Sequence, residues 1–170
     1  MKGNRGKLCQ PKNALRNSQE PEKKKDEKQE AVDEIGRLYG KRLTKLSGAV
    51  YQSTDMNAGF IIPRAKWNSD RNPSYARFFF SIAVGQIDRL KAFKEQYLIV
   101  ICEGMGFMRF NLQEFLPWLS YVSPFMKKGT DEPLHWDPEF HFYPDGQIIL
   151  QLGKGKSVDV RNGFTPWKAS

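Results

Sequence analysis

Two residues in the first half of the chain, Asp55 and Lys66, have the types and spacing that could cleave a phosphodiester bond. Such cleavage with magnesium needs carboxylate or carbonyl oxygens on the ion and a cation near the attacking water. An aspartate before one strand, with an acid and a lysine two residues apart on the next, would place these groups on one face. Lys66 fits this pattern, but Arg64 stands where the second acid is needed. A guanidinium cannot ligate a cation, so the expected magnesium site lacks one ligand.

The same residues also have a structural interpretation. Asp55 lies in the sequence Ser-Thr-Asp-Met-Asn, where its carboxylate could accept hydrogen bonds from backbone N–H groups of a turn. Arg64 and Lys66 could form a solvated cationic strand end that contacts phosphate without cutting it. The sequence leaves both interpretations open.

The charge balance narrows the class of partner. Of the 170 residues, 27 are Lys or Arg and 19 are Asp or Glu, which gives a net charge of +8. This excess favours DNA or RNA as a partner. The length suits one domain with a core, and no apolar run approaches the ~20 residues of a membrane span, so no membrane partner is expected. With two cysteines that form no framework, we expect an intracellular location: cytoplasmic at the nucleoid, or an organelle matrix.

The hydrophobic pattern predicts an α/β or α+β fold with a central mixed sheet flanked by helices. Residues 1–28 hold nine Lys or Arg, four Asp or Glu and few large apolar side chains, so we expect a disordered basic tail. The core is expected over 29–120, and 121–170 are expected to be an extension with a β-hairpin. The predicted helices span about 29–41, 83–96 and 112–122, and the predicted strands and hairpin span 47–53, 59–63, 75–82, 97–102, 107–111, 140–152 and 157–161.

Several segments together resemble a known family in order and spacing. They are KRLTKLSGA, STDMNAG, PRAK, RFFFSIAVGQIDRLKAF and YLIVICEGMGFMRFNLQEF. This series is similar to the Holliday junction resolvases of the RecU and archaeal types, which belong to the PD-(D/E)XK nuclease superfamily. The resemblance covers roughly residues 30–116, and its most specific parts are the SGA segment and the apolar strand that runs into a helix opening with a glutamine.

The resemblance implies a restriction-endonuclease-like sheet and a role for each matching residue. Asp55 would be the metal-binding aspartate and Lys66 the catalytic lysine. Glu30 or Glu34 on the first helix would supply the additional acid for Mg²⁺. Gln86 takes the helix-start position of the family pattern, on the expected nucleic-acid surface. The implied function is metal-dependent, structure-specific cleavage of branched DNA.

A homodimer is the assembly that this function implies, because a four-way junction needs two symmetric cuts. Arg64 departs from the family pattern and supports an alternative: a catalytically inactive relative that binds DNA or RNA structurally. A ribonucleoprotein component, for instance of an organellar ribosome, is one such role.

Basic residues along the core are predicted to border one groove and to neutralise phosphates. The alternative is that they are scattered over a solvated surface. The set comprises Lys41, Arg42, Lys45, Arg64, Lys66, Arg71, Arg77 and Arg89, with Lys91 and Lys94 beside it.

Two further features carry weaker hypotheses. The sequence GKGKS resembles a phosphate-binding loop, but Leu150 stands where that pattern needs a glycine, and a strand is predicted to follow. The aromatic segments FLPWLSYVSPF, LHW and FHFY could cover a partner, which makes a protein-interaction module a third possibility.

Overall fold

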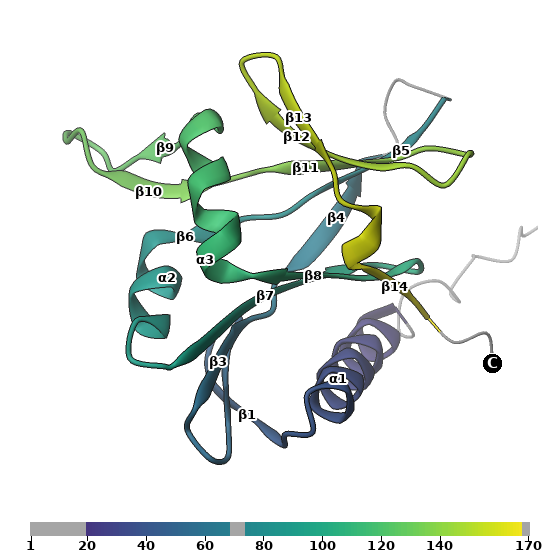
Figure 1. Ribbon diagram of the computed structural model, residues 1–170, viewed down its shortest axis with the longest axis vertical. Helices are drawn as coiled ribbons and strands as arrows, with labels where there is room; N and C mark the ends of the chain where they lie inside the picture. Colours follow the sequence, from purple (N-terminus) through teal and green to yellow (C-terminus); the bar gives the residue numbers. More distant parts are fainter. Residues whose placement is uncertain (1–19, 69–73, 168–170) are drawn as a thin grey trace, which may run out of the picture.

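The structure, a computed structural model, describes residues 20–68 and 74–167, with the backbone alone for residues 20–27. Its helical segments are α1 (Glu20–Leu38), α2 (Val84–Leu90), α3 (Leu112–Phe115), η1 (Leu116–Tyr121) and η2 (Arg161–Gly163). Its strands are β1 (Leu43–Ser47), β2 (Val50–Ser53), β3 (Ala58–Ile61), β4 (Arg64–Asn68), β5 (Ala76–Phe79), β6 (Ile82–Ala83), β7 (Glu95–Cys102), β8 (Gly106–Asn111), β9 (Phe125–Met126), β10 (Pro133–Trp136), β11 (Glu139–Phe142), β12 (Ile148–Gly153), β13 (Lys156–Asp159) and β14 (Phe164–Pro166) (Figure 1).

Strands β3 and β4 follow one another along the same side of β7, and this continuous segment is the centre of the sheet. Both strands pair in parallel with β7 at the same offset: Ala58 lies opposite Glu95, and Arg64 opposite Ile101. The backbone N–H of Ile101 also donates to the carbonyl of Pro63 at 3.0 Å. Proline has no N–H to donate to the strand ladder, so the segment bends at Pro63 but stays beside β7. Chain direction therefore stays constant from Ala58 to Lys66.

The remaining strands complete a mixed sheet around β3, β4 and β7. The order of the eleven-stranded sheet is β1-β2-β3-β7-β4-β5-β11-β12-β13, with β8 also on β7 and β14 on β8. β2 pairs antiparallel with β3, and β5 pairs antiparallel with β4. A small separate sheet has the order β6-β10-β9. The predicted mixed α/β architecture is confirmed, with three α-helices among the described residues.

Helices cover the two faces of the sheet unequally. α1 buries apolar side chains three and four residues apart, as an amphipathic helix must. The α1 face of the core contains Ala31, Val32, Ile35, Tyr51, Phe60, Ile62, Ile99, Ile101 and Phe107. α2 and α3 pack on the opposite face, whose buried residues include Ile61, Ala65, Phe78, Leu90, Leu98, Val100, Leu112, Phe115, Phe140 and Leu150.

The first helix differs from its predicted bounds of 29–41. It begins at Glu20, inside the segment expected to be a disordered tail, because a run of strong helix formers can extend a helix that is already nucleated by packing. It ends at Leu38, because Gly40 takes a left-handed conformation with φ of 62°. The N–H of Lys41 then donates to the carbonyl of Gly36 at 2.8 Å, which closes the helix end. Residues 1–19 of the predicted tail lie outside the described residues.

The segment 47–53, predicted as one strand, is the turn and second strand of a hairpin. Ser47 and Val50 are register partners, so Gly48 and Ala49 form a two-residue turn. Gly48 has a φ of 53°, a conformation that glycine adopts without steric cost. The second predicted helix is also shorter than expected and ends at Leu90.

Residues beyond 120, expected to be an extension, complete the main sheet. β11 pairs with β5, and β12 pairs with β11. Phe140 and Leu150 are fully buried in the same core cluster as Leu98. The boundary expected at residue 120 therefore does not divide the core. In the described part of the chain, no helix is both long and apolar enough to cross a bilayer.

Candidate nucleic-acid interface

Asp55 and Lys66 lie at opposite ends of the central strand β7. Asp55 is in the turn before β3, where the carbonyl of Asn57 accepts a hydrogen bond from the N–H of Glu95 at the start of β7. Lys66 follows Ala65, which pairs with Cys102, the last residue of β7. Eight residues of strand separate these ends by about 20 Å or more at ~3.3 Å per residue. The expectation that the two side chains share one site is therefore wrong.

The Asp55 carboxylate is occupied by contacts that hold its own turn. It accepts hydrogen bonds from the Lys41 ammonium at 2.8 Å, from the Ser53 hydroxyl, and from the backbone N–H of Asn57 at 3.1 Å. These contacts, led by Lys41, lower the pKa of the Asp55 carboxyl well below its usual range. The alternative in which Asp55 is a turn residue therefore describes the structure, with Lys41 as an additional partner from the loop after α1.

Replacing Asp55 with asparagine is expected to lower the melting temperature at neutral pH. A carboxyl whose folded-state pKa is depressed stabilises the fold above its unfolded value of 3.8, and this stabilisation is lost as pH falls through the folded-state pKa. The difference in melting temperature between wild type and Asp55→Asn should thus shrink below about pH 4. Thermal unfolding followed by circular dichroism between pH 3 and 7 measures it.

Asp131→Asn, at an exposed position of the β9–β10 hairpin, is the matched control for that series. It removes the same charge without a hydrogen-bonded partner of this kind. Equal effects of the two substitutions at neutral pH would contradict the role assigned to the Lys41 contact.

The acids predicted to hold Mg²⁺ do not assemble into a ligand set. Glu30 is exposed on α1. Glu34 forms an ion pair with Arg37 at 2.5 Å, one turn along the same helix. Among residues 28–68 and 74–167, His, Cys, Asp and Glu side chains form no group of three or more that could ligate a metal ion. With Asp55 bonded to an ammonium, the residues present do not fit the expected magnesium site.

Cations gather instead on the α1 face, where β1, β2 and β4 lie beside the helix. Lys45 is the register partner of Tyr51, so both side chains lie on this face. The Lys28 ammonium of α1 lies 5.8 Å from the centre of the Tyr51 ring, a cation–π distance. Arg64 and Lys66 join them on β4, on the face opposite the buried Ala65. We call Lys28, Lys45, Arg64 and Lys66 the basic cluster.

Lys28 is partly buried and lies near two other cations of the basic cluster. Burial, together with the charges of Lys45 and Arg64, lowers the pKa of the Lys28 ammonium below its ordinary value. Like charges held this close raise the free energy of the protein alone. A bound polyanion relieves that repulsion, so the arrangement favours phosphate over water as its neighbour.

The other predicted basic residues do not border the same groove. Lys41 bonds Asp55 at the far end of β7, and Arg42 is exposed nearby, its carbonyl accepting from Thr54. Arg89 lies on α2, on the opposite face of the sheet, and donates to Ser47. Arg71 lies outside the described residues. The prediction of one continuous groove is therefore wrong for Lys41, Arg42 and Arg89.

Gln86 and Arg77 have structural partners. The side-chain oxygen of Gln86 accepts a hydrogen bond from the N–H of Ala83 at 3.0 Å and caps α2. The Arg77 guanidinium makes two hydrogen bonds of 2.7 Å to the Glu139 carboxylate, which also contacts His141. Burial would raise the pKa of Glu139, but the bonds from Arg77 and His141 outweigh it and lower that pKa. The charge of Arg77 is thus largely neutralised on the protein.

One residue of this surface, Lys28, was not predicted from the sequence. Lys28 was counted with the tail, although its position three residues before Ala31 and four before Val32 predicts that it points toward the sheet once the helix extends that far. Trp67, next to Lys66 in the sequence, has 65% of its surface exposed. It shares the face of Ala65 and of its register partner Phe78, so its side chain points away from the basic cluster.

The chain matches no protein-family model, no curated protein and no solved structure. The similarity to the resolvases therefore rests on the quoted segments alone.

Proposed function

We propose that this protein binds the sugar-phosphate backbone of structured DNA or RNA through the basic cluster, without cutting it, as a non-catalytic relative of the resolvases. The observation that carries the proposal is the common face of the four cations: Lys28 lies over the Tyr51 ring, Lys45 is the register partner of Tyr51, and Arg64 and Lys66 lie opposite the buried Ala65. Arg64 occupies the position of the missing motif acid, and Lys28 comes from the helix on which an additional acid was expected. Cations thus stand where metal ligands would be required.

Backbone binding is the mode that suits this chemistry. Each ammonium or guanidinium can neutralise one phosphate and release its counterions, which makes affinity strongly dependent on salt. Such contacts position a protein on nucleic acid but do not read its sequence.

The geometry argues against the endonuclease expected from the resemblance. Hydrolysis would require carboxylates near Lys66, yet Asp55 lies at the other end of β7 and is bonded to Lys41. Within the described residues no three potential ligands converge on one point. We therefore derive no catalytic step for Lys66 and assign it a phosphate contact.

Binding of the full chain to fluorescein-labelled nucleic acids, followed by anisotropy over a series of salt concentrations, tests the proposal. A four-way DNA junction, a DNA duplex and a hairpin RNA serve as probes. With four phosphates neutralised, the plot of log affinity against log salt should have a slope of about −3 to −4. A flat salt dependence, or no binding at low salt, would overturn the proposal.

Cleavage is tested in the same samples by adding Mg²⁺ or Mn²⁺ and resolving the labelled strands on a denaturing gel. We expect intact strands. Symmetric nicks that disappear in the Asp55→Asn variant would show a nuclease and contradict the non-catalytic assignment.

A further inference from the structure

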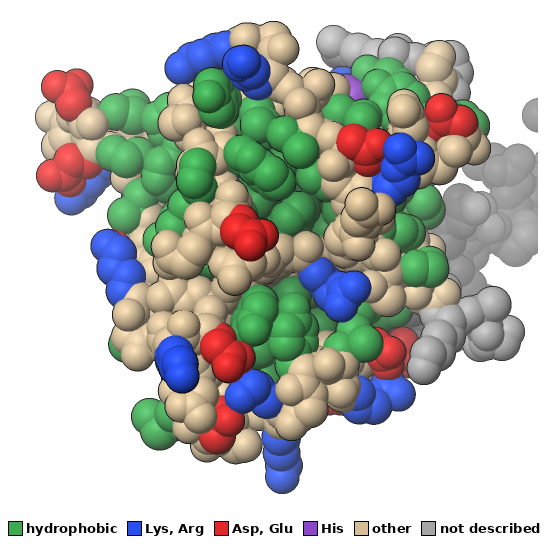
Figure 2. All heavy atoms as spheres, viewed as in Figure 1, with side chains coloured by type: hydrophobic (Ala, Val, Ile, Leu, Met, Phe, Trp, Pro, Cys, Tyr) green, Lys and Arg blue, Asp and Glu red, His purple; other side chains and the backbone are tan. Residues whose placement is uncertain are grey.

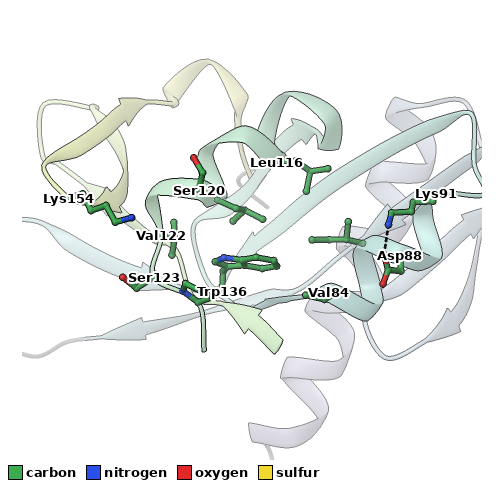
Figure 3. A pocket seen from close by; sticks show the side chains of 12 residues that line it. Val84, Asp88, Lys91, Leu116, Ser120, Val122, Ser123, Trp136 and Lys154 are labelled. Atoms are coloured by element: carbon green, nitrogen blue, oxygen red, sulfur yellow. Dashed lines mark hydrogen bonds and ion pairs between the residues drawn. The ribbon is translucent and has the colours of Figure 1, made fainter. Parts of the chain in front are cut away.

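An apolar groove of about 590 Å³ lies on the face of the sheet opposite the basic cluster. Trp136 of β10 lies across its floor, with Leu116 above it and Val84 of α2 beside it (Figure 3). Ile87 and Leu119 complete the apolar wall. This volume is in the range of small-ligand and peptide-anchor sites. The groove therefore has room for one or two large apolar side chains.

The apolar surface continues beyond the groove onto the β9–β10 hairpin. Leu134 lies two residues before Trp136 on β10, at a register shift between Pro133 and His135. Leu134 is 50% exposed, and Phe125, Met126 and Tyr121 are exposed as well. Figure 2 shows apolar side chains gathered over this hairpin and next to the η1 segment. Large exposed apolar groups of this kind mark interaction sites rather than ordinary solvent-facing surface.

Lys154 stands at one end of this groove, in the turn between β12 and β13, and Lys156 follows as the first residue of β13. Lys154 lines the groove at the end away from the Asp88–Lys91 ion pair (Figure 3). The Lys156 ammonium lies 5.7 Å from the centre of the Tyr121 ring. Among the described residues, Lys154 has no acidic partner within ion-pair distance. The GKGKS sequence does not match the phosphate-binding-loop pattern. It places positive charge at the end of an apolar groove.

The backbone of this turn holds Lys154 in a costly conformation. Its φ is 51°, between glycines with φ of 83° and 72°. A non-glycine residue in the left-handed region raises the free energy of the fold, and asparagine or glycine would suit the position better. The two-residue turn between Gly153 and Lys156 accounts for these positive φ values, and the Lys154 side chain extends toward the groove (Figure 3).

We propose that this groove docks a peptide segment of a partner protein in which large apolar side chains are followed by an acidic residue. The apolar anchors fill the space over Trp136 and extend along Leu134, and the carboxylate pairs with Lys154. The segment has this chemistry because the groove offers apolar walls and one unneutralised positive end. Nucleic acid offers no apolar side chain to fill the floor, so Lys154 recognises a carboxylate.

Selection of peptides from a random display library on the full chain, with counter-selection on the Lys154→Glu variant, tests this inference. We expect enriched sequences that combine two or more aromatic or aliphatic residues with Asp or Glu. The most enriched peptide, synthesised with a fluorescein label, should bind Lys154→Glu about tenfold more weakly than wild type. Leu134→Ala should weaken binding to a similar degree.

Lys128→Glu, an exposed charge reversal on the hairpin tip, is the matched control and should bind the peptide as wild type does. A peptide whose acids are replaced with lysines should bind Lys154→Glu better than wild type, because the charges are then complementary again. Enriched peptides without acidic residues, or equal binding by wild type and Lys154→Glu, would overturn the proposal.

A second copy of the chain or a nucleic acid in the groove would give different experimental results. Self-association in analytical ultracentrifugation that Leu134→Ala abolishes would show that a second copy of the chain fills the groove, and would overturn the proposal. A loss of nucleic-acid affinity in Lys154→Glu as large as that in Lys45→Glu would assign the lysines to nucleic acid, with the same consequence. Unchanged nucleic-acid binding with lost peptide binding is the expected result.

Discussion

The combined substitution Lys28→Gln, Lys45→Glu and Lys66→Glu is expected to lower the affinity for a labelled four-way junction about a hundredfold or more at low salt. Two of these changes reverse a charge, so each replaces attraction of a phosphate with repulsion. The slope of log affinity against log salt should become shallower by about 2 to 3, since each lost contact contributes ~0.9. Anisotropy titrations at several salt concentrations measure both quantities.

The melting temperature distinguishes residues that bind nucleic acid from residues that stabilise the fold. The pKa of Lys28 is lowered in the folded state, so the protonated ammonium disfavours folding at pH values below that pKa. Lys45→Glu turns this repulsion into attraction, so it should keep or raise the melting temperature and raise the pKa of Lys28, while it weakens binding. A melting temperature that falls together with the affinity would contradict the assignment.

Lys128→Glu is the control for net charge, because it makes the same change at an exposed site distant in sequence from the basic cluster. It should change the affinity little. An equal loss in Lys128→Glu and Lys45→Glu would mean that net charge, and no particular surface, attracts the nucleic acid.

The main failure of the sequence interpretation was to bring Asp55 and Lys66 together. The motif places its acid and its lysine in one site only if the chain reverses between them. Here the segment from Ala58 to Lys66 runs on in one direction along β7, with Pro63 as a bend. Extended chain moves away at ~3.3 Å per residue, so the absence of a second turn signal after Asn57 was the physical clue.

Elements with a strong local pattern were predictable. The continuous apolar run at 97–102 is β7, because a strand buried on both faces needs no polar alternation. The predicted strand at 107–111 is β8, which pairs with β7 around the intervening glycine turn. Such patterns depend on neighbours in sequence, and they locate an element without locating its partners.

Long-range pairing was the part that sequence could not supply. The union of β11 with β5 joins Phe140 to Phe78 across more than sixty residues, and no periodicity encodes that pairing. β9, β10 and β14 are strands of four residues or fewer, too short for a hydrophobic pattern. The basic cluster likewise depends on packing, since Lys28 reaches Tyr51 only because α1 lies on that face.

Gly106→Ala is expected to produce the largest loss of stability, about 3 kcal/mol. Gly106 has a φ of 151°, which a residue with a side chain rarely adopts. A Cβ there would overlap the backbone oxygen of Thr165 and lie 2.7 Å from the Cα of Pro166. Both neighbours belong to β14, which pairs with β8 at this point, so relief requires β14 to move away.

Thermal unfolding by circular dichroism should therefore show a melting temperature lower by about 6 to 12 °C for a domain of this size. Gly104→Ala shares the positive φ, 74°, but its added Cβ would meet no heavy atom within 4 Å, so it isolates backbone strain and should cost about 1 kcal/mol. Gly85→Ala lies in α2, where an added Cβ would also meet nothing within 4 Å, and should stabilise by up to about 1 kcal/mol. If Gly106→Ala were no less stable than Gly104→Ala, the close approach of β14 to β8 would be wrong, since only that contact distinguishes the two sites.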